Sequence, residues 1–240
     1  MKILYRYSDS NNLKNRPYWF NKRNILKHFI SRFDKPENEI FVFADNVSDD
    51  TIQFLNSIIK DPINHVSKTS LGNAGSFLHI YNFAIKHFQD NEIIYFAEDD
   101  YVYTKNASKI LEEGIRGLNA DYVTGYDHPD KYMNGNEGGN PQIRENGELS
   151  IVRLSPSSHW KYTNSTTMTF AATVNTLKND YITFFTNAHG LSAPQDYSIF
   201  CELILNKHRK LASCLPGCAT HCELEFMSPL ISWEDELNDL

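Results

Sequence analysis

The sequence contains no long apolar run. Nowhere does it approach the roughly 20 consecutive apolar residues of a membrane-spanning helix, and its first ten residues, MKILYRYSDS, lack the apolar core of a signal peptide. Positive charge is also scarce, because 23 basic residues stand against 30 acidic ones and the formal net charge is −7. Such a balance gives no general attraction to nucleic acid or to an anionic membrane. We therefore expect a cytoplasmic protein with no transmembrane segment and no nucleic-acid partner.

The sequence also has no linker rich in proline, glycine or serine that would divide it into domains. Its 240 residues are enough to form one substantial core. We therefore expect one domain over residues 1–240.

Cysteine is rare: there are four, and Cys214, Cys218 and Cys222 lie close to His221 in the sequence. Their spacing fits no common zinc module, and disulfides are disfavoured in a reducing compartment. Buried free thiols are thus favoured over a structural zinc site.

The first half of the chain alternates strand-like and helix-like segments, which is the pattern of a parallel sheet with crossover helices. Strands are expected at residues 2–7, 39–44, 63–67, 93–100, 121–125, 165–174 and 211–214. Helices are expected after Pro17 and at residues 48–60, 74–87, 105–118, 175–187 and 195–207. Residues 129–147 are rich in glycine, asparagine and charge, which predicts a mobile loop, and the acidic tail 233–240 is expected to fray or dock loosely.

The fourth expected strand ends in three carboxylates, Glu98, Asp99 and Asp100. Parallel sheets place their ligand sites at the carboxyl ends of strands. Carboxylate oxygens are hard ligands suited to Mg²⁺ or Mn²⁺, and an ion held in this way completes its shell with water and substrate phosphates. The cluster therefore indicates a divalent cation and a phosphorylated donor. The alternative is a solvated acidic turn that caps the next helix.

Taken in order, the features of the chain resemble the GT-A glycosyltransferases, particularly inverting family-2-like enzymes and small viral or bacterial nucleotide-sugar transferases. The ordered features are the end of the first strand, Asp45, LGNAGS, EDD, TTMTF, QDYS and His221. The resemblance implies a single α/β GT-A domain. It would have a Rossmann-like, mostly parallel central sheet flanked by helices, and a smaller mixed C-terminal sheet portion. Residues 1–104 would form the nucleotide-binding half, and residues 105–240 the acceptor and catalytic half.

The resemblance also implies roles for single residues. Asp100 would ligate Mn²⁺ or Mg²⁺ in a DXD-like motif, and His221 would complete the metal shell unless it is a structural histidine. Asp196 would deprotonate the acceptor hydroxyl, with Asp127 as the runner-up base; a helix-capping role is the alternative for Asp196. Arg16 is either a phosphate ligand or an exposed cation. The residues expected to contact the nucleotide-sugar donor are Arg6, Ser8, Asp9, Asp45, Asn73, Gly75, Glu98 and Asp99.

The activity implied is that of a metal-dependent hexosyl- or deoxyhexosyltransferase. It would move a sugar from a nucleoside-diphosphate donor, most suitably UDP-linked, to a glycan or another hydroxyl acceptor with inversion. Three alternatives remain open: a nucleotidyltransferase that makes a sugar nucleotide, a non-catalytic carbohydrate-binding domain of the same fold, and a glycosyltransferase with a retaining mechanism. The sequence leaves open the sugar, the nucleotide, the acceptor and the oligomeric state.

Overall fold

The computed structural model describes residues 1–10 and 14–239, which divide into two compact units. The first unit comprises Met1–Leu13, Asp34–Asp99 and Thr167–Arg209, and the second comprises Lys14–Phe33, Asp100–Thr166 and Lys210–Leu240. Each unit is built from three separated segments of the chain. The expectation of one domain whose halves meet near residue 104 remains a prediction.

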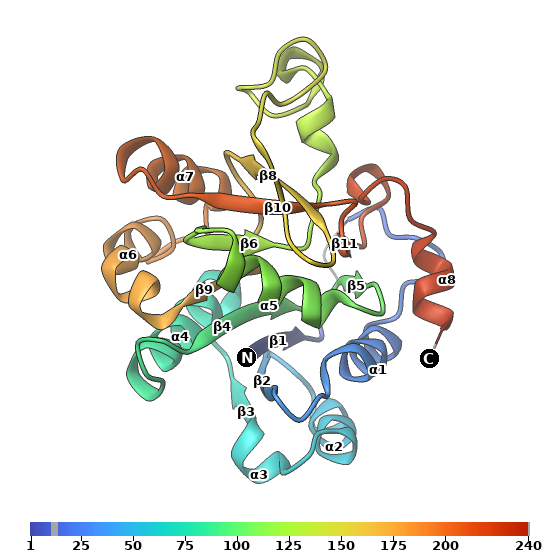
Figure 1. Ribbon diagram of the computed structural model, residues 1–240. Coiled ribbons are helices and arrows are strands. Elements are labelled where there is room, and N and C mark those ends of the chain that lie inside the picture. The colour runs from blue at the N-terminus through green and yellow to red at the C-terminus, as the bar shows by residue number, and fades with distance from the viewer. Residues whose placement is uncertain (11–13, 240) are drawn as a thin grey trace. The chain divides into compact units, whose positions relative to one another are not determined.

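The first unit contains a mostly parallel sheet in the order β3-β2-β1-β4-β9. Its strands are β1 (Lys2–Ser8), β2 (Glu39–Asp45), β3 (Val66–Thr69), β4 (Ile93–Glu98) and β9 (Phe170–Thr173), of which β9 runs antiparallel to β4. Figure 1 shows β1 between β2 and β4. Because both faces of such a sheet are covered, β1 and β4 are apolar along most of their length.

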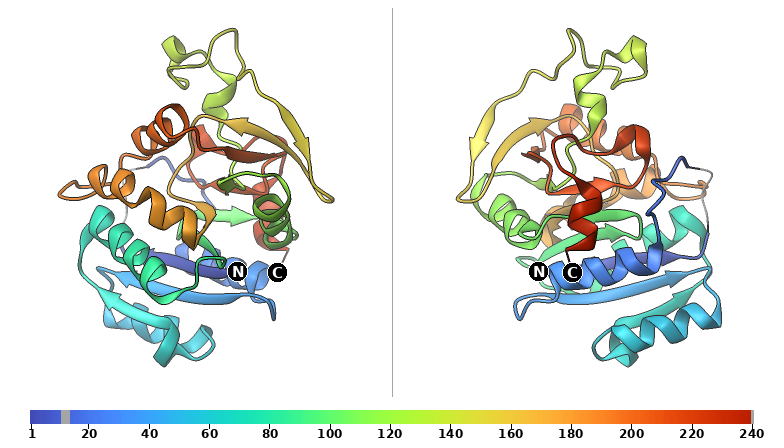
Figure 2. Two further views of the ribbon diagram at one scale, coloured as in Figure 1. Left: turned by 60° about the vertical axis from the view of Figure 1, so that its left-hand side comes forward. Right: turned by 90° about the vertical axis from the view of Figure 1, so that its right-hand side faces the viewer.

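Helices of the first unit pack on this sheet and on each other. They are α2 (Asp49–Ile58), α3 (Pro62–His65), α4 (Gly72–His87), α6 (Val174–Thr186) and α7 (Asp196–Cys201), which continues as the π-helical turn Glu202–Asn206. The left-hand view of Figure 2 shows α4 and α6 side by side. Between them the rings of Tyr81 and Phe184 lie 4.8 Å apart, and the Tyr81 hydroxyl donates to the carbonyl of Leu177. Aromatic packing thus fixes the layer that covers β4 and β9.

The second unit contains a smaller mixed sheet in the order β6-β10-β8-β7 and a two-stranded sheet of β5 and β11. The strands are β5 (Tyr101–Tyr103), β6 (Tyr122–Thr124), β7 (Val152–Leu154), β8 (His159–Thr163), β10 (Leu211–Leu215) and β11 (Ala219–His221). The helices are α1 (Lys22–Phe33), α5 (Ala107–Gly117) and α8 (Trp233–Asn238). The two sheets agree with the predicted α/β fold, which has a mostly parallel portion and a smaller mixed one.

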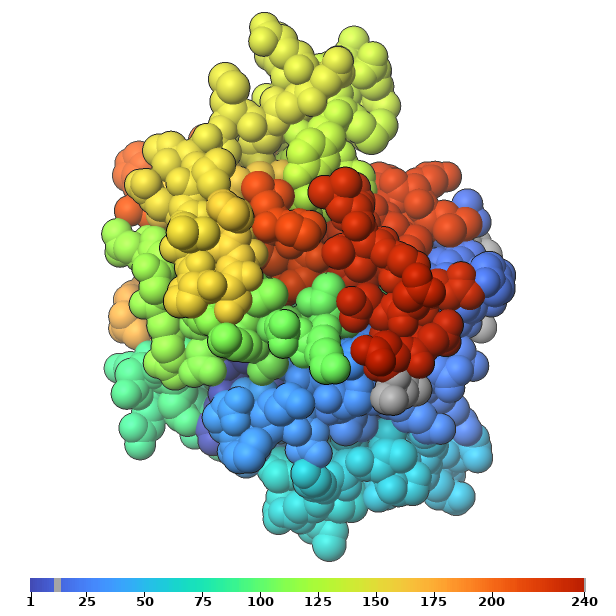
Figure 3. All heavy atoms as spheres, turned by 45° about the vertical axis from the view of Figure 1, so that its right-hand side comes forward, coloured from blue at the N-terminus to red at the C-terminus, as the bar shows by residue number. Residues whose placement is uncertain are grey.

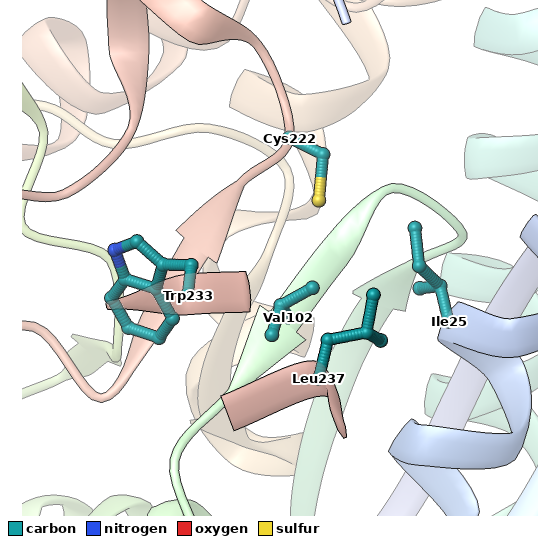
Figure 4. Close-up of a cluster of buried hydrophobic side chains, with 5 residues drawn as sticks. All are labelled: Ile25, Val102, Cys222, Trp233 and Leu237. Atoms are coloured by element: carbon teal, nitrogen blue, oxygen red, sulfur yellow. The ribbon is translucent and has the colours of Figure 1, made fainter. Parts of the chain in front are cut away.

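The acidic tail is not loosely docked, which corrects the expectation. Its residues Trp233–Asn238 form α8, which lies beside α1 in the right-hand view of Figure 2. Trp233 and Leu237 are buried against Ile25, Val102 and Cys222 (Figure 4). The indole nitrogen of Trp233 also donates to the carbonyl of Ser228, at 2.7 Å. Two apolar residues four positions apart therefore outweigh the surrounding acidic residues, because they share one face of the helix.

Several strand boundaries also differ from those expected. Residues 63–65 belong to α3 because Pro62 suits the first turn of a helix, so β3 begins later, at Val66. β4 ends at Glu98, two residues before the expected end of the fourth strand, and β5 follows the turn at Asp99 and Asp100. β9 begins only at Phe170, and β5, β7, β8 and β11 were not predicted.

The polar segment predicted as a mobile loop contains two short 3₁₀ turns, at Pro129–Tyr132 and Gly135–Glu137, and an isolated bridge between Arg144 and Gly147. In Figure 3 its yellow-green spheres project beyond the red C-terminal residues of the same unit. Its base, however, is held by buried polar side chains. The Lys131 ammonium donates to Asn164 and to Ser165, and the Asn140 amide also donates to Ser165. The loop is therefore anchored at its root.

No helix among residues 1–10 and 14–239 has both the length and the apolar character needed to cross a bilayer.

Candidate active site

Residues predicted from three distant segments meet at the carboxyl edge of the first unit's sheet. Parallel pairing places Arg6 of β1 beside Glu98 of β4, and Ser8 beside Asp45 of β2. The Arg6 guanidinium is bonded to the Glu98 carboxylate, and it also donates to the backbone carbonyl of Asn73 (2.7 Å) and to its side-chain oxygen (2.9 Å). Arg6 is thus a buried tie between β1, β4 and the start of α4.

Asp45 lies at the same edge and is saturated by intramolecular donors. Its Oδ1 accepts from the Thr69 hydroxyl (2.8 Å) and from the backbone N–H of Leu71 (2.6 Å). Its Oδ2 accepts from the backbone N–H of Gly72 (3.0 Å) and from the Asn46 amide (2.7 Å). A carboxylate has about four lone-pair sites, so these donors fill its capacity. A nucleoside would contact Asp45 only by replacing one of them.

Gly75 and Gly72 shape the turn that Asp45 holds. A Cβ at Gly75 would lie 3.0 Å from the Cβ of Leu71, which is closer than most such contacts in proteins. Gly72 has a φ of +73°, in the left-handed region that favours glycine. The small residues of LGNAGS are therefore required by the entry into α4, whatever ligand lies near it.

Ser8 and Asp9 connect the end of β1 to two neighbouring segments. The backbone N–H of Ser8 donates to Asp99 Oδ2 at 2.7 Å. The Asp9 carboxylate accepts from the backbone N–H of Ser48 and from the Thr51 hydroxyl, both at 2.8 Å, at the start of α2. All eight residues predicted to contact the donor therefore lie along this edge of the first unit's sheet or at the entry into α4. Many of their polar atoms are used to hold the edge together.

A second predicted group forms within the second unit, where β5 pairs with β11. His221 lies opposite Tyr101, and the backbone N–H of Cys222 donates to the carbonyl of Asp100. This pairing brings Asp100 Oδ2 to 3.0 Å from His221 Nε2 although the two residues are far apart in the sequence. Asp100 and His221 are both buried. The two predicted metal ligands therefore converge.

Two cations accompany this pair. Arg16 donates to Asp100 Oδ2 at 2.8 Å, and the Lys14 ammonium lies 3.0 Å from His221 Nε2 and 4.0 Å from Asp100 Oδ2. Burial alone would raise the pKa of Asp100. The neighbouring charges of His221, Lys14 and Arg16 outweigh that effect and hold the pKa well below its usual range. Asp100 is therefore an ionised carboxylate, which is the form that binds a metal.

The geometry of Asp100 and His221 suits a divalent ion. Neighbouring ligands about 2.1 Å from an octahedral ion are about 3 Å apart, which matches the spacing of Oδ2 and Nε2. Glu223 Oε2 lies 3.4 Å from His221 Nδ1, and it would orient the ring if Nε2 held an ion. Within the described part of the chain, however, no group of three or more His, Cys, Asp or Glu side chains is arranged to hold a metal. An ion held here would complete its shell with phosphate oxygens or water.

The two predicted bases differ in their surroundings. Asp196 is the first residue of α7, is partly exposed, and accepts from the backbone N–H of Tyr197 at 2.7 Å. Asp127 is 2% exposed, lies 3.0 Å from the Lys161 ammonium and accepts from the Tyr132 hydroxyl at 2.7 Å. An acceptor hydroxyl could reach Asp127 only by displacing one of these two partners, whereas the partly exposed Asp196 can be approached from solvent. Asp196 therefore remains the better candidate.

Two polar residues near Asp100 and His221 were missed in the sequence. Glu223 follows His221 by two positions, and that spacing was its only signal. Lys14 lies in NNLKNRP, where nothing local indicates a partner as distant as Asp100. Arg16, weighed as a phosphate ligand or an exposed cation, is instead a largely buried partner of Asp100.

Comparisons with known proteins support the fold only. No protein-family model matches the chain, and no curated protein matches it in sequence. A structure of S. aureus TarS matches 88% of this chain and 34% of its own at 20% identity, with a TM-score of 0.51. A TarS structure of residues 1–349 matches 89% of this chain at 19% identity with a TM-score of 0.48, and this chain spans 58% of it.

Two further solved structures have TM-scores just below 0.5 and carry no argument. One is galactosyltransferase LgtC in complex with donor and acceptor sugar analogues, at 8% identity over 89% of this chain and 73% of its own, with a TM-score of 0.49. The other is CMP:2-keto-3-deoxy-manno-octonic acid synthetase complexed with CTP. It matches at 14% identity over 90% of this chain and 91% of its own, also with a TM-score of 0.49. The TarS structure with a TM-score of 0.51 supports, for the fold alone, the α/β architecture that the sequence predicts.

Proposed function

We propose that this chain is a metal-dependent glycosyltransferase that moves a sugar from a nucleoside-diphosphate donor, UDP-linked, to a hydroxyl acceptor such as a glycan, with inversion. We further propose that it acts in the cytoplasm as a single domain. The nucleoside would bind at the edge formed by the ends of β1, β2 and β4 and the start of α4. Asp100 and His221 would hold Mn²⁺ or Mg²⁺.

The observation that carries the proposal is the 3.0 Å approach of Asp100 Oδ2 and His221 Nε2. The two residues were selected from separate motifs, and their meeting was not implied by either motif alone. Glu223 next to Nδ1 adds the arrangement in which a carboxylate orients a ligating imidazole.

The proposed reaction is a single displacement. The acceptor oxygen forms a bond to the anomeric carbon while the bond from that carbon to the diphosphate oxygen breaks. Asp196 would take the proton of the acceptor hydroxyl. A bound divalent ion would supply charge neutralisation for the departing nucleoside diphosphate. Arg16, held by Asp100 and by the carbonyl of Cys222, would place a fixed guanidinium next to the metal ligands.

Calorimetric titration with UDP, with and without Mn²⁺, tests the metal ligand. Asp100→Ala should abolish the Mn²⁺-dependent part of UDP binding, because it removes the ionised carboxylate. Glu225→Ala removes an exposed carboxylate of the same unit and should leave that binding unchanged. Mn²⁺-dependent binding that survives in Asp100→Ala would refute the assignment.

Asp196→Asn tests the base separately. It should stop transfer to the acceptor and leave UDP affinity nearly intact, because the amide retains the shape but cannot take a proton. Slow release of UDP from a nucleotide sugar by the wild-type chain would exclude a non-catalytic binding domain. Consumption of a nucleoside triphosphate together with a sugar phosphate would instead identify a nucleotidyltransferase.

A further inference from the structure

The Lys14 ammonium lies among the groups that a divalent ion would use. Its Nζ is 3.0 Å from His221 Nε2, 3.5 Å from Glu223 Oε2 and 4.0 Å from Asp100 Oδ2. A positive charge therefore already stands beside both predicted metal ligands. With Arg16 it balances the two carboxylates, since two cationic side chains face two anionic ones.

The contact between Lys14 and His221 conflicts directly with metal ligation. The Lys14 ammonium lies 3.0 Å from Nε2, the ring nitrogen that also faces Asp100 Oδ2. A divalent ion bound to Asp100 Oδ2 and His221 Nε2 would bring positive charge into the same space, where it would be repelled by the ammonium. The ammonium and the ion therefore compete for the same position beside these two side chains.

Arg16 and Lys14 differ in how firmly they are held. The Arg16 guanidinium donates to the Cys222 carbonyl (2.7 Å), stacks on the Phe20 ring at 4.5 Å and has a side chain that is 15% exposed. The Lys14 side chain is 34% exposed and has a flexible stem. Among the described residues, its ammonium contacts His221, Glu223 and Asp100. Lys14 is therefore the cation that can leave.

We propose that Lys14 is an exchangeable internal cation: its ammonium occupies the Asp100–His221 pair when no divalent ion is bound, and it must leave before an ion can bind. The proposal rests on the proposed function, from which it takes the metal ligands. The exchange weakens affinity for the free ion. A nucleoside diphosphate relieves that cost, because a phosphate oxygen accepts well from a displaced ammonium. Metal and donor would then bind cooperatively.

Binding of Mn²⁺ alone, measured by electron paramagnetic resonance of the free ion without nucleotide, tests the exchange. Lys14→Met should bind Mn²⁺ about tenfold more tightly than the wild type, equivalent to about 1.4 kcal/mol. Lys14→Arg keeps the charge and should show no such gain. Lys105→Met removes an exposed lysine of the same unit and should match the wild type. Lys14→Gln serves as a second neutral variant, and thermal unfolding establishes that each variant is folded.

The outcomes separate this inference from the proposed function. If folded Lys14→Met and Lys14→Gln bind Mn²⁺ no more tightly than the wild type, the exchange is refuted. The metal assignment still stands in that case if Asp100→Ala loses Mn²⁺-dependent UDP binding. If neither the wild type nor the neutral variants bind Mn²⁺, with or without UDP, both the exchange and the metal assignment fall. Tighter binding that disappears in the Lys14→Met, Asp100→Ala double variant supports both.

Discussion

Asp45→Ala would distinguish a carboxylate that holds a turn from one that contacts a nucleoside. The change removes the acceptor of two backbone N–H groups, those of Leu71 and Gly72, and of two side-chain donors. A hydrogen bond to a charged group contributes about 1.5–3 kcal/mol. Leu71 and Gly72 are not fully buried, so water replaces part of what is lost. Taking the lower value for the two backbone donors alone gives a loss of about 3 kcal/mol in the free energy of unfolding.

Urea denaturation followed by circular dichroism measures this loss, and UDP titration of the folded fraction measures binding. Asp45→Asn keeps one acceptor oxygen and should lose less stability than the alanine variant. Asp90→Asn is the control, because it weakens only an exposed pair with Lys178 and should change stability by less than about 1 kcal/mol. If Asp45→Ala keeps wild-type stability and loses UDP affinity, the carboxylate is a ligand contact, and the argument from its filled lone pairs is wrong.

Two other predictions concern the second unit. Gly114→Ala should destabilise the protein by about 1–3 kcal/mol in urea denaturation, because the new Cβ would lie 2.5 Å from the buried Trp160 ring. The control is Gly117→Ala in the same helix, whose Cβ meets nothing within 4 Å and which should be neutral or stabilising. Equal effects of the two variants would contradict the predicted clash with Trp160. Burial, with a smaller effect of a nearby arginine, lowers the pKa of His28 to about 4. The unfolded chain takes up the proton first, so stability falls as the pH drops from about 6.5 to about 4, by about 3 kcal/mol in total. Denaturation of His28→Gln at several pH values should show a smaller fall, and an unchanged fall would exclude His28 as its source.

The sequence predicts the early strands well because their residues are buried on both faces. β1, β2 and β4 are apolar runs bounded by polar residues, and each was located within about two residues of its observed ends. β7 could not be found in this way, because it has only three residues and all of them are exposed. α8 was missed because acidic residues dominate its sequence, although Trp233 and Leu237 have the spacing of one helical face.

The sequence predicted which residues lie at the candidate site better than it predicted their hydrogen-bond partners. Asp100 and His221 were chosen from their motifs, and the pairing of β5 with β11 brings them together. Intramolecular saturation of Asp45 could not be predicted, because its donors come from a turn whose backbone conformation depends on Gly72. Lys14 was missed for a related reason. A contact between residues so far apart in the chain is determined by tertiary structure and leaves no local pattern.

The packing of α8 has a consequence for synthesis on the ribosome. Ile25 belongs to an early part of the chain, whereas its neighbours Trp233 and Leu237 belong to the last described helix. Domains tend to fold as their residues emerge, yet this cluster cannot close until both of its ends have been made. Apolar residues of α1 and β5 therefore stay uncovered until α8 has been synthesised. The second unit, which includes α8, completes its core after the last segment of the first unit has been made.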